Sequence, residues 1–183
     1  MEEKAFELGV LVGRFQTLHT GHAYMIAKAV QLCRRVGIFV GSSQESGTAK
    51  NPYDYETRER MLRRLCPEAE VFPLPDIGVG NNSVWGDYVL SNIVERFGRE
   101  PDLMISGKED RRSGWFDSAR GLNAAELYVP KVIDISATEM RGFMIDNDLE
   151  QWRKYTPQVL WEEYELLRSA VLTSMHNTET ASI

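Results

Sequence analysis

The sequence predicts an α/β fold in which helices cover both faces of a parallel sheet, giving three layers, followed by a helical C-terminal segment. Three observations predict this class: short apolar runs alternate with helical periodicity, the first strand–helix–strand unit is complete, and the last third of the chain has a helical pattern. The length of 183 residues suits one domain. We expect that domain over residues 1–172 and a flexible polar tail over 173–183.

The first unit of the predicted sheet begins with a strand over Phe6–Val12. Apolar side chains then recur on one side of a helix over Tyr24–Cys33, and a second strand follows over Val36–Val40. A strand, a crossover helix and a parallel strand form the repeating unit of this fold class.

The remaining elements are predicted from the same alternation. Pro157 suits the opening of the last helix, and the stretch between the last two strands is expected to be a mobile active-site loop. The elements are a charged helix over 54–65, a strand over 69–74, a helix over 84–97, strands over 103–106 and 127–129, and helices over 138–145 and 159–172.

The composition excludes several classes of protein. With 21 Lys and Arg against 27 Asp and Glu, the formal net charge is −6, so no overall positive field attracts nucleic acid. Apolar runs such as Leu8–Val12 are too short to cross a bilayer, and no targeting segment is evident, so we expect a cytoplasmic protein. Cys33 and Cys66 lack the spacing of a zinc site or a disulfide framework, which predicts two reduced, buried thiols.

The segment Gly13–His22 directly follows the first strand and carries the clearest chemical signal. Two of the three histidines of the chain, His19 and His22, lie there, and Arg14 lies beside them. At the carboxyl end of a strand, loop amides and a helix N-terminus favour an anion, and Gly13 and Gly21 allow the backbone to approach it. The alternative is that one histidine caps the helix and the other packs in the core.

A second segment, Ile135–Arg141, has the pattern of another phosphate-binding helix start. Ser136 or Thr138 can cap the helix that follows, the free N–H groups of that helix suit phosphate oxygens, and Arg141 lies one turn later on the same side. A serine cap followed by an arginine is common by itself. Together with the two histidines it favours a triphosphate.

Both segments resemble motifs of the nucleotidyltransferase superfamily. Gly13–His22 is similar to the GRFQPxHxGH form of its HxGH motif, and Ile135–Arg141 is similar to its ISxTxxR motif. Thr17 stands where members usually carry proline, which leaves the loop less rigid and removes no chemical group. The resemblance implies a Rossmann-like fold of the HUP type.

The resemblance also implies the reaction. An acceptor phosphate oxygen attacks the α-phosphorus of a nucleoside triphosphate and pyrophosphate leaves, with Mg²⁺ bound mainly through the triphosphate oxygens and without protein metal ligands. By analogy, the catalytic residues are His19 and His22 on the triphosphate, Arg141 on its β- and γ-phosphates, and Arg14 on a phosphate of either substrate.

The same analogy extends the expected ATP site. Ser106 and Gly107 resemble a family loop that approaches adenine and ribose, although Lys108 replaces an asparagine there and Arg111, Arg112, Trp115 and Phe116 are additional. The ATP-binding residues implied by the resemblance are Gly13, Arg14, Phe15, Gly21, Ser106, Gly107, Ser136, Thr138 and Arg141.

Within the superfamily the chain most resembles the archaeal-type nicotinamide mononucleotide (NMN) adenylyltransferases. Similar segments are Gly41–Ser46 (GSxQxS), Lys50–Tyr53 (NPF), Pro73–Ile77 (PIPDI) and Asn82–Trp85 (NxxW). The acceptor-binding residues implied by this resemblance are Ser42, Arg58, Asn82 and Trp85.

Two of these four residues have simpler alternatives. The indole of Trp85 suits stacking on the cationic pyridinium ring of NMN, but Trp85 equally suits packing in the core. Arg58 would be a phosphate ligand by analogy, whereas its charged neighbours in sequence favour a solvated helix face.

The expected function is adenylyl transfer from ATP to NMN, giving NAD and pyrophosphate. Two alternatives stay open: an enzyme of the same fold that uses CTP or another phosphorylated acceptor, and a non-catalytic nucleotide sensor. The expected partners are small molecules, neither nucleic acid nor a membrane. The resemblance also allows for a homo-oligomer, since close relatives assemble into multimers.

Overall fold

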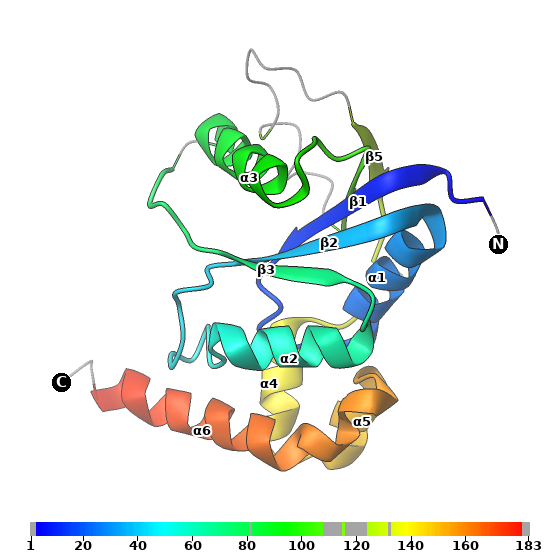
Figure 1. The fold of residues 1–183 in the computed structure, drawn as a ribbon. Coiled ribbons are helices and arrows are strands. Elements are labelled where there is room, and N and C mark those ends of the chain that lie inside the picture. The colour runs from blue at the N-terminus through cyan, green and yellow to red at the C-terminus, as the bar shows by residue number, and fades with distance from the viewer. Residues whose placement is uncertain (1–2, 81, 108–114, 116–123, 132, 181–183) are drawn as a thin grey trace.

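The computed structural model of the chain describes residues 3–80, 82–107, 115, 124–131 and 133–180. Its centre is a sheet of five parallel strands in the order β3-β2-β1-β4-β5 (Figure 1). The strands are β1 (Phe6–Gly13), β2 (Cys33–Gly41), β3 (Glu70–Leu74), β4 (Leu103–Ser106) and β5 (Ala125–Tyr128).

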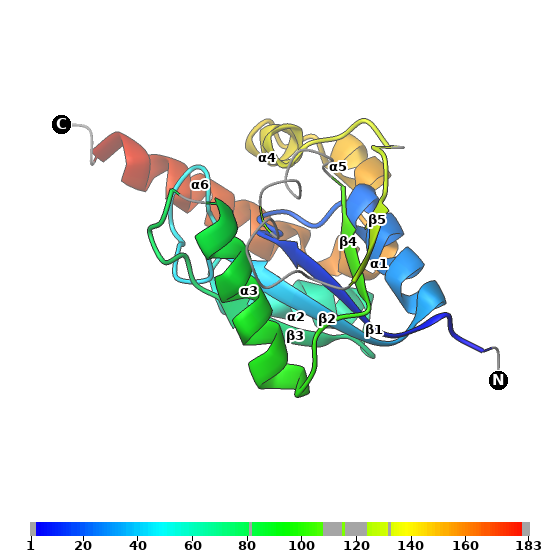
Figure 2. The same ribbon diagram turned by 90° about the horizontal axis from the view of Figure 1, so that it is seen from above.

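Helices cover both faces of this sheet, as Figures 1 and 2 show. Helices α1 (Thr20–Leu32) and α2 (Tyr55–Leu65) lie on one face, and α3 (Asn82–Phe97) lies on the other. The predicted three-layer α/β class is therefore confirmed. Beyond α2 lies the predicted helical segment, which consists of α4 (Ala137–Ile145), α5 (Leu149–Tyr155), the 3₁₀ helix η2 (Gln158–Glu163) and α6 (Tyr164–Thr180).

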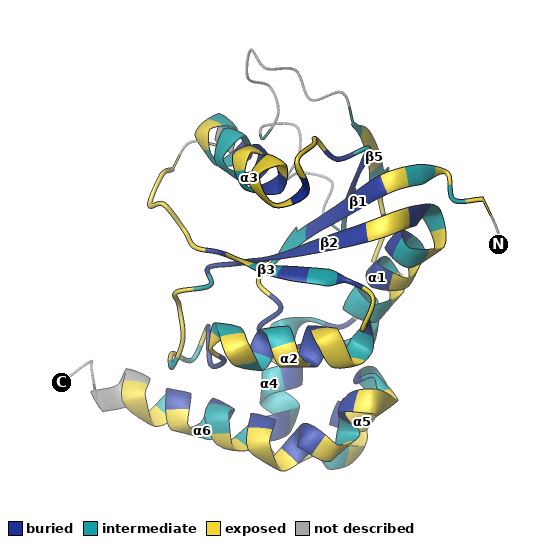
Figure 3. Cartoon of the chain, in the orientation of Figure 1, coloured by how far each residue is buried: buried dark blue, intermediate teal, exposed yellow. Residues whose placement is uncertain are grey.

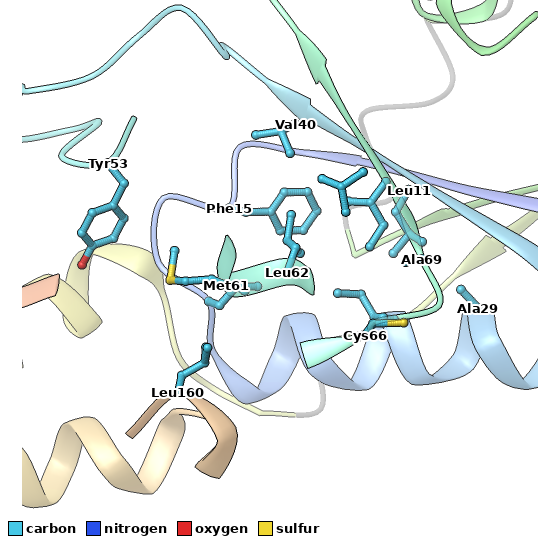
Figure 4. Close-up of a cluster of buried hydrophobic side chains, with 14 of the residues drawn as sticks. Leu11, Phe15, Ala29, Val40, Tyr53, Met61, Leu62, Cys66, Ala69 and Leu160 are labelled. Atoms are coloured by element: carbon cyan, nitrogen blue, oxygen red, sulfur yellow. The ribbon is translucent and has the colours of Figure 1, made fainter. Parts of the chain in front are cut away.

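Two buried clusters hold these layers together, because successive side chains of a strand point to opposite faces of the sheet. Leu8 and Val10 of β1 join the cluster beneath α3, and Leu11 joins the larger cluster beneath α1 and α2. Figure 3 shows the buried middle of β1 and β2 between these layers, and Figure 4 shows part of the larger cluster. The loops at the carboxyl ends of the strands are thus anchored on both sides.

The first helix and the last helix differ from the sequence prediction. α1 begins at Thr20 and not at Tyr24, because its first turn contains a glycine and a histidine that carry no apolar periodicity. At the other end, the helix expected over 159–172 is divided into η2 and α6, and α6 continues to Thr180. Residues 173–180, expected as a flexible tail, are therefore helical, and Ser174 is buried with its hydroxyl donating to the Val171 carbonyl.

One short helix, α5, was not predicted. It is capped by Asp148, whose carboxylate accepts from the Gln151 N–H, and it is held by Trp152, which is only 1% exposed. Seven residues with one buried side chain give no helical period to detect. The loop expected between the last two strands lies mainly outside the described residues. Among the described helices, none is long and apolar enough to cross a membrane.

Candidate active site

The candidate site lies beside β1, where the strand order of the sheet reverses. β1 pairs with β2 on one side and with β4 on the other, so the chain builds outward from β1 in both directions. In open α/β sheets the crevice outside the strand ends at such a point is the usual ligand site. Residues 14–19, which connect β1 to α1, therefore occupy the position at which the sequence predicts a ligand.

Phe15 determines the shape of this connection. Its φ is +50°, in the left-handed region, and its ring is buried in the larger cluster (Figure 4). A Cβ added at Gly13 would lie 3.0 Å from this ring, so the close fold of the loop requires glycine there. The expectation that Phe15 binds ATP is corrected for its side chain, which packs in the core. The expected ATP contact of Phe15 is therefore limited to its backbone.

His19 and His22 come together as the sequence predicts. His19 occupies the N-cap position of α1 but makes no side-chain cap bond, and its carbonyl accepts from the N–H groups of His22 and Ala23. The two imidazole centroids are 3.9 Å apart with the planes inclined by 32°. A Cβ at Gly21 would lie 3.0 Å from the His19 ring, so glycine makes room for it.

The environment of the two rings keeps both neutral near pH 7. Burial, with a smaller contribution from the positive Lys131, lowers the pKa of His19 to about 4. Burial also lowers the pKa of His22, with His19 adding to the effect. Both Nδ1 atoms are buried without a hydrogen-bond partner among the described residues. An anion at these rings would supply a partner and raise their pKa values.

Arg14 and Arg141 approach the same region from different elements. Arg14 is exposed on the β1–α1 connection, and Arg141 is half-buried on α4, where its Nη2 donates to the Thr138 hydroxyl at 3.3 Å. Burial is the main cause that lowers the pKa of Arg141; Tyr53 opposes it and Arg14 adds to it. The two guanidinium groups therefore interact electrostatically, which favours a ligand with several negative charges.

The start of α4 has the predicted cap. The Ser136 hydroxyl accepts from the Glu139 N–H at 3.2 Å, and the Glu139 carboxylate accepts from the Ser136 N–H at 2.9 Å, which completes a capping box. The Ser136 side chain thus supports the helix, and Thr138 remains exposed in the first turn.

Arg58 is the clearest correction to the predicted site. Its side chain is fully buried, and its guanidinium donates only to backbone carbonyls among the described contacts. It is neither a phosphate ligand nor part of a solvated helix face. Ser42, which precedes it in the β2–α2 connection, is also buried, has a φ of +49°, and accepts from Arg58 and from the Glu45 N–H through its carbonyl.

Trp85 packs partly against aromatic neighbours, and its stacking on an acceptor ring stays a prediction. It is half-buried, and its ring lies 5.4 Å from Tyr88 and 6.3 Å from Trp115, edge to face with the latter. A Cβ at Gly86 would lie 1.6 Å from the Trp115 carbonyl oxygen, so the Trp115 backbone lies directly against α3 at this glycine. The Asn82 backbone begins α3, and its side chain is outside the described residues.

The other predicted ATP residues lie at the end of β4. Ser106 closes the strand, and a Cβ at Gly107 would lie 3.0 Å from the Met25 sulfur of α1. This contact holds the end of β4 against α1, the helix that begins at the two histidines. Lys108, Arg111, Arg112 and Phe116 lie outside the described residues.

Three residues near the site were not among the predicted site residues. Lys131 is exposed, pairs with Asp134 and lies near enough to His19 to affect its pKa. Gln16 and Tyr53 exchange two hydrogen bonds, with the Tyr53 N–H donating to the Gln16 amide oxygen at 3.0 Å and the Gln16 amide nitrogen donating to the Tyr53 carbonyl at 3.2 Å. Gln16 and Tyr53 lie far apart in the chain, so local sequence patterns do not reveal that they are in contact.

Comparison with known proteins gives consistent matches. A model of the cytidylyltransferase-like family matches residues 10–170. Nicotinamide-nucleotide adenylyltransferase from Thermococcus kodakarensis is 32% identical over 161 residues, covering 84% of this chain and 80% of that protein. The protein of the same name from Pyrococcus horikoshii is 33% identical over 160 residues, with the same two coverages of 84% and 80%.

Solved structures share the fold at lower identity. A bifunctional NMN adenylyltransferase/ADP ribose pyrophosphatase from Francisella tularensis superposes with a TM-score of 0.71 at 22% identity, covering 90% of this chain and 49% of that one. This chain thus spans about half the length of that protein. A structure of the same Francisella protein with AMP and an Mn ion has a TM-score of 0.62 at 20% identity, covering 90% of this chain and 52% of that one.

The family match covers both segments that carry the predicted motifs. These are Gly13–His22, which begins at the end of β1, and Ile135–Arg141, at the start of α4. It agrees with the parallel sheet and with the pairing of the two histidines beside it. The resemblance to nucleotidyltransferases is therefore confirmed, and the chain belongs to the cytidylyltransferase-like family.

Proposed function

We propose that this chain transfers the adenylyl group of ATP to NMN, giving NAD and pyrophosphate. The observation that carries the proposal is the pair of neutral imidazoles, His19 and His22, 3.9 Å apart at a helix start, with buried Nδ1 atoms that have no partner among the described residues. The relatives from Thermococcus and Pyrococcus, which are named nicotinamide-nucleotide adenylyltransferases, support the choice of substrates.

In the proposed reaction a phosphate oxygen of NMN attacks the α-phosphorus of ATP. A new P–O bond forms there, the bond from the α-phosphorus to the bridging oxygen breaks, and pyrophosphate carries that electron pair away. No protein nucleophile takes part, so the protein positions the two anions and offsets their charge.

Each charged or polar group has a role in this proposal. His22 donates to a nonbridging oxygen of the α-phosphate, where negative charge grows in the transition state, and His19 donates to the neighbouring phosphate. Arg141 and Thr138, both in the first turns of α4, bind the β- and γ-phosphates, and Arg14 binds a phosphate of either substrate. Lys131 joins this set because it already acts electrostatically on His19.

A divalent cation in this reaction would be carried by ATP. Over the described part of the chain, no three His, Cys, Asp or Glu side chains gather in a way that would hold a metal ion. The groups around the histidines are cationic or neutral, which suits phosphate oxygens and not Mg²⁺ itself. The proposal therefore puts Mg²⁺ on the ATP phosphates and derives no step from a metal held by protein ligands.

The acceptor end of the proposal rests on the region of α3. The half-buried indole of Trp85 leaves part of its surface free for the pyridinium ring of NMN, an interaction worth about 0.5 to 2 kcal/mol. Ser42 and the Asn82 backbone complete this end, while Ser106 and Gly107 face the adenosine. Arg58 is no longer in the acceptor set, because all its donors are used by carbonyls.

The decisive experiment is a substrate matrix with the full chain. The protein is mixed with Mg²⁺, with ATP or CTP, and with NMN, nicotinate mononucleotide or another phosphorylated acceptor, and pyrophosphate and the dinucleotide product are measured. We expect pyrophosphate and NAD only with ATP and NMN together, apart from any activity with nicotinate mononucleotide. Release only with CTP and not with ATP would refute adenylyl transfer, and no release with any pair would favour a nucleotide sensor.

A further inference from the structure

Arg58 carries a charge in a place where a charge is costly. It lies in the first turns of α2, and its relative exposure is 0%. A buried guanidinium is tolerated only when its donors are satisfied. Its hydrogen bonds run from Nε to Asp54 O (3.1 Å), from Nη1 to Arg14 O (3.1 Å) and Gly41 O (3.0 Å), and from Nη2 to Ser42 O (3.1 Å), Ser43 O (3.2 Å) and Glu45 O (3.4 Å).

These six carbonyls belong to the two connections that border the candidate site. One comes from the β1–α1 connection, one from the N-cap of α2, and four from the end of β2 and the connection after it. None of these six contacts is to a carboxylate. Burial lowers the pKa of Arg58, while the carboxylates of Asp54 and Glu56 oppose this at longer range. The guanidinium is therefore used to organise backbone and not to bind an acidic side chain.

The direction of these carbonyls fixes the direction of the neighbouring amides. Every peptide bond in the described residues is trans, and in a trans peptide the C=O and N–H bonds point in opposite directions. Because the carbonyls of Arg14 and Ser43 point at Arg58, the N–H groups of the residues that follow them, Phe15 and Gln44, point away from it. The N–H that follows Ser42 is already used, since Ser43 donates to the Leu74 carbonyl. Backbone N–H groups turned outward together favour an anion.

We propose that Arg58 is a positioning residue for substrate phosphates: it holds the β1–α1 and β2–α2 connections in the conformation that turns their peptide N–H groups toward the substrates. This inference rests on the proposed function for the identity of the substrates. Since four of the six carbonyls lie at or after the end of β2, the effect falls mainly on the acceptor, NMN, and less on ATP.

The test compares Arg58→Lys and Arg58→Gln with wild type. Lysine keeps the charge and has three donors on one atom, which cannot span carbonyls from both connections; glutamine keeps two donors without the charge. Arg63→Lys is the matched control, because Arg63 lies on the same helix, is exposed and pairs with Glu59. For each protein we measure the unfolding midpoint, kcat, the KM of each substrate, and the dissociation constant of NMN by calorimetry, which needs no turnover.

The expected result is a split between the two substrates. Arg58→Lys folds, its KM and dissociation constant for NMN rise by about 10-fold or more, and its KM for ATP changes by less than about 3-fold. Arg58→Gln has a larger effect in the same direction, and Arg63→Lys behaves as wild type.

Three results would overturn the inference: a folded Arg58→Lys with an unchanged KM for NMN, an equal rise for both substrates, or failure of both Arg58 variants to fold, which would make Arg58 a requirement of the fold alone. Failure of the proposed function is recognised separately, because wild type itself would then make no NAD.

Discussion

The neutral state of His19 predicts a specific dependence of stability on pH. The perturbation is a change from pH 7 to pH 4.5 in wild type and in His19→Asn. In the folded chain burial lowers the pKa of His19 from its ordinary value of 6.5 to about 4, with Lys131 contributing. In the unfolded chain the ring is solvated and takes up a proton near pH 6.5.

The sign and size of the effect follow from these two pKa values. Between pH 6.5 and pH 4 the unfolded state binds more protons at His19 than the folded state, so lowering the pH favours unfolding. Above pH 6.5 the full stability is present, and it is lost as the pH falls through this window. From pH 7 to pH 4.5 the loss caused by this one ring amounts to about 2 kcal/mol.

The assay is urea unfolding of both proteins at each pH, together with NMR titration of the imidazole resonances. The chain has three histidines, so His176 on α6 gives a reference resonance far along the sequence. Subtracting the pH effect in His19→Asn from that in wild type removes the contribution of all other groups that titrate alike in both. We expect that difference to be about 2 kcal/mol, with wild type the more sensitive protein.

Two outcomes would refute this reasoning. One is a His19 resonance that titrates near pH 6.5 in the folded, ligand-free protein, which would mean that the ring is solvated. The other is an equal loss of stability in wild type and in His19→Asn. Lys131→Met serves as a control, because it should raise the pKa of His19 only in part, burial being the larger cause.

Three further predictions concern single side chains. His22→Ala should lower kcat by about 10²-fold or more with an unchanged circular dichroism spectrum, because it removes a donor to the transition state; near-normal turnover would contradict that role. Ser136→Ala should cost about 1 kcal/mol in urea unfolding and raise the KM for ATP, since the capping box orders the start of α4; an unchanged KM would separate the cap from ATP binding. Glu163→Gln should lower the free energy of unfolding by about 1 kcal/mol, because this carboxylate accepts from Arg60 and Arg64; the loss should shrink at high salt, and a salt-independent loss would point to packing instead.

The parts of the site that follow from local sequence were predictable. The strand before Gly13, the helix start at the two histidines and the Ser136 cap all depend on residues within a few positions of one another. Gly21 and the three-residue spacing of the histidines are enough to place the two imidazole rings side by side at the first turn of α1. For the same reason the alternation of strands and helices indicated the fold class.

The parts that depend on distant contacts were not predictable. Arg58 reads as a charged surface residue in sequence, yet its acceptors are contributed by residues as far as 44 positions away, and only the folded chain brings them together. Trp115 similarly lies on Gly86 through a contact that no local pattern indicates. The surroundings of such residues depend on packing between distant segments, which the hydrophobic periodicity of the sequence does not indicate.

The exchange of hydrogen bonds between Gln16 and Tyr53 has a consequence for how much substrate binding costs. It ties the two connections beside the histidines to each other, although Thr17 stands at a position where proline would have stiffened the first of them. Rotational freedom that proline would have removed from the unfolded chain is instead given up here as the chain folds. A ligand that binds beside these connections would therefore have less loop entropy to remove on binding.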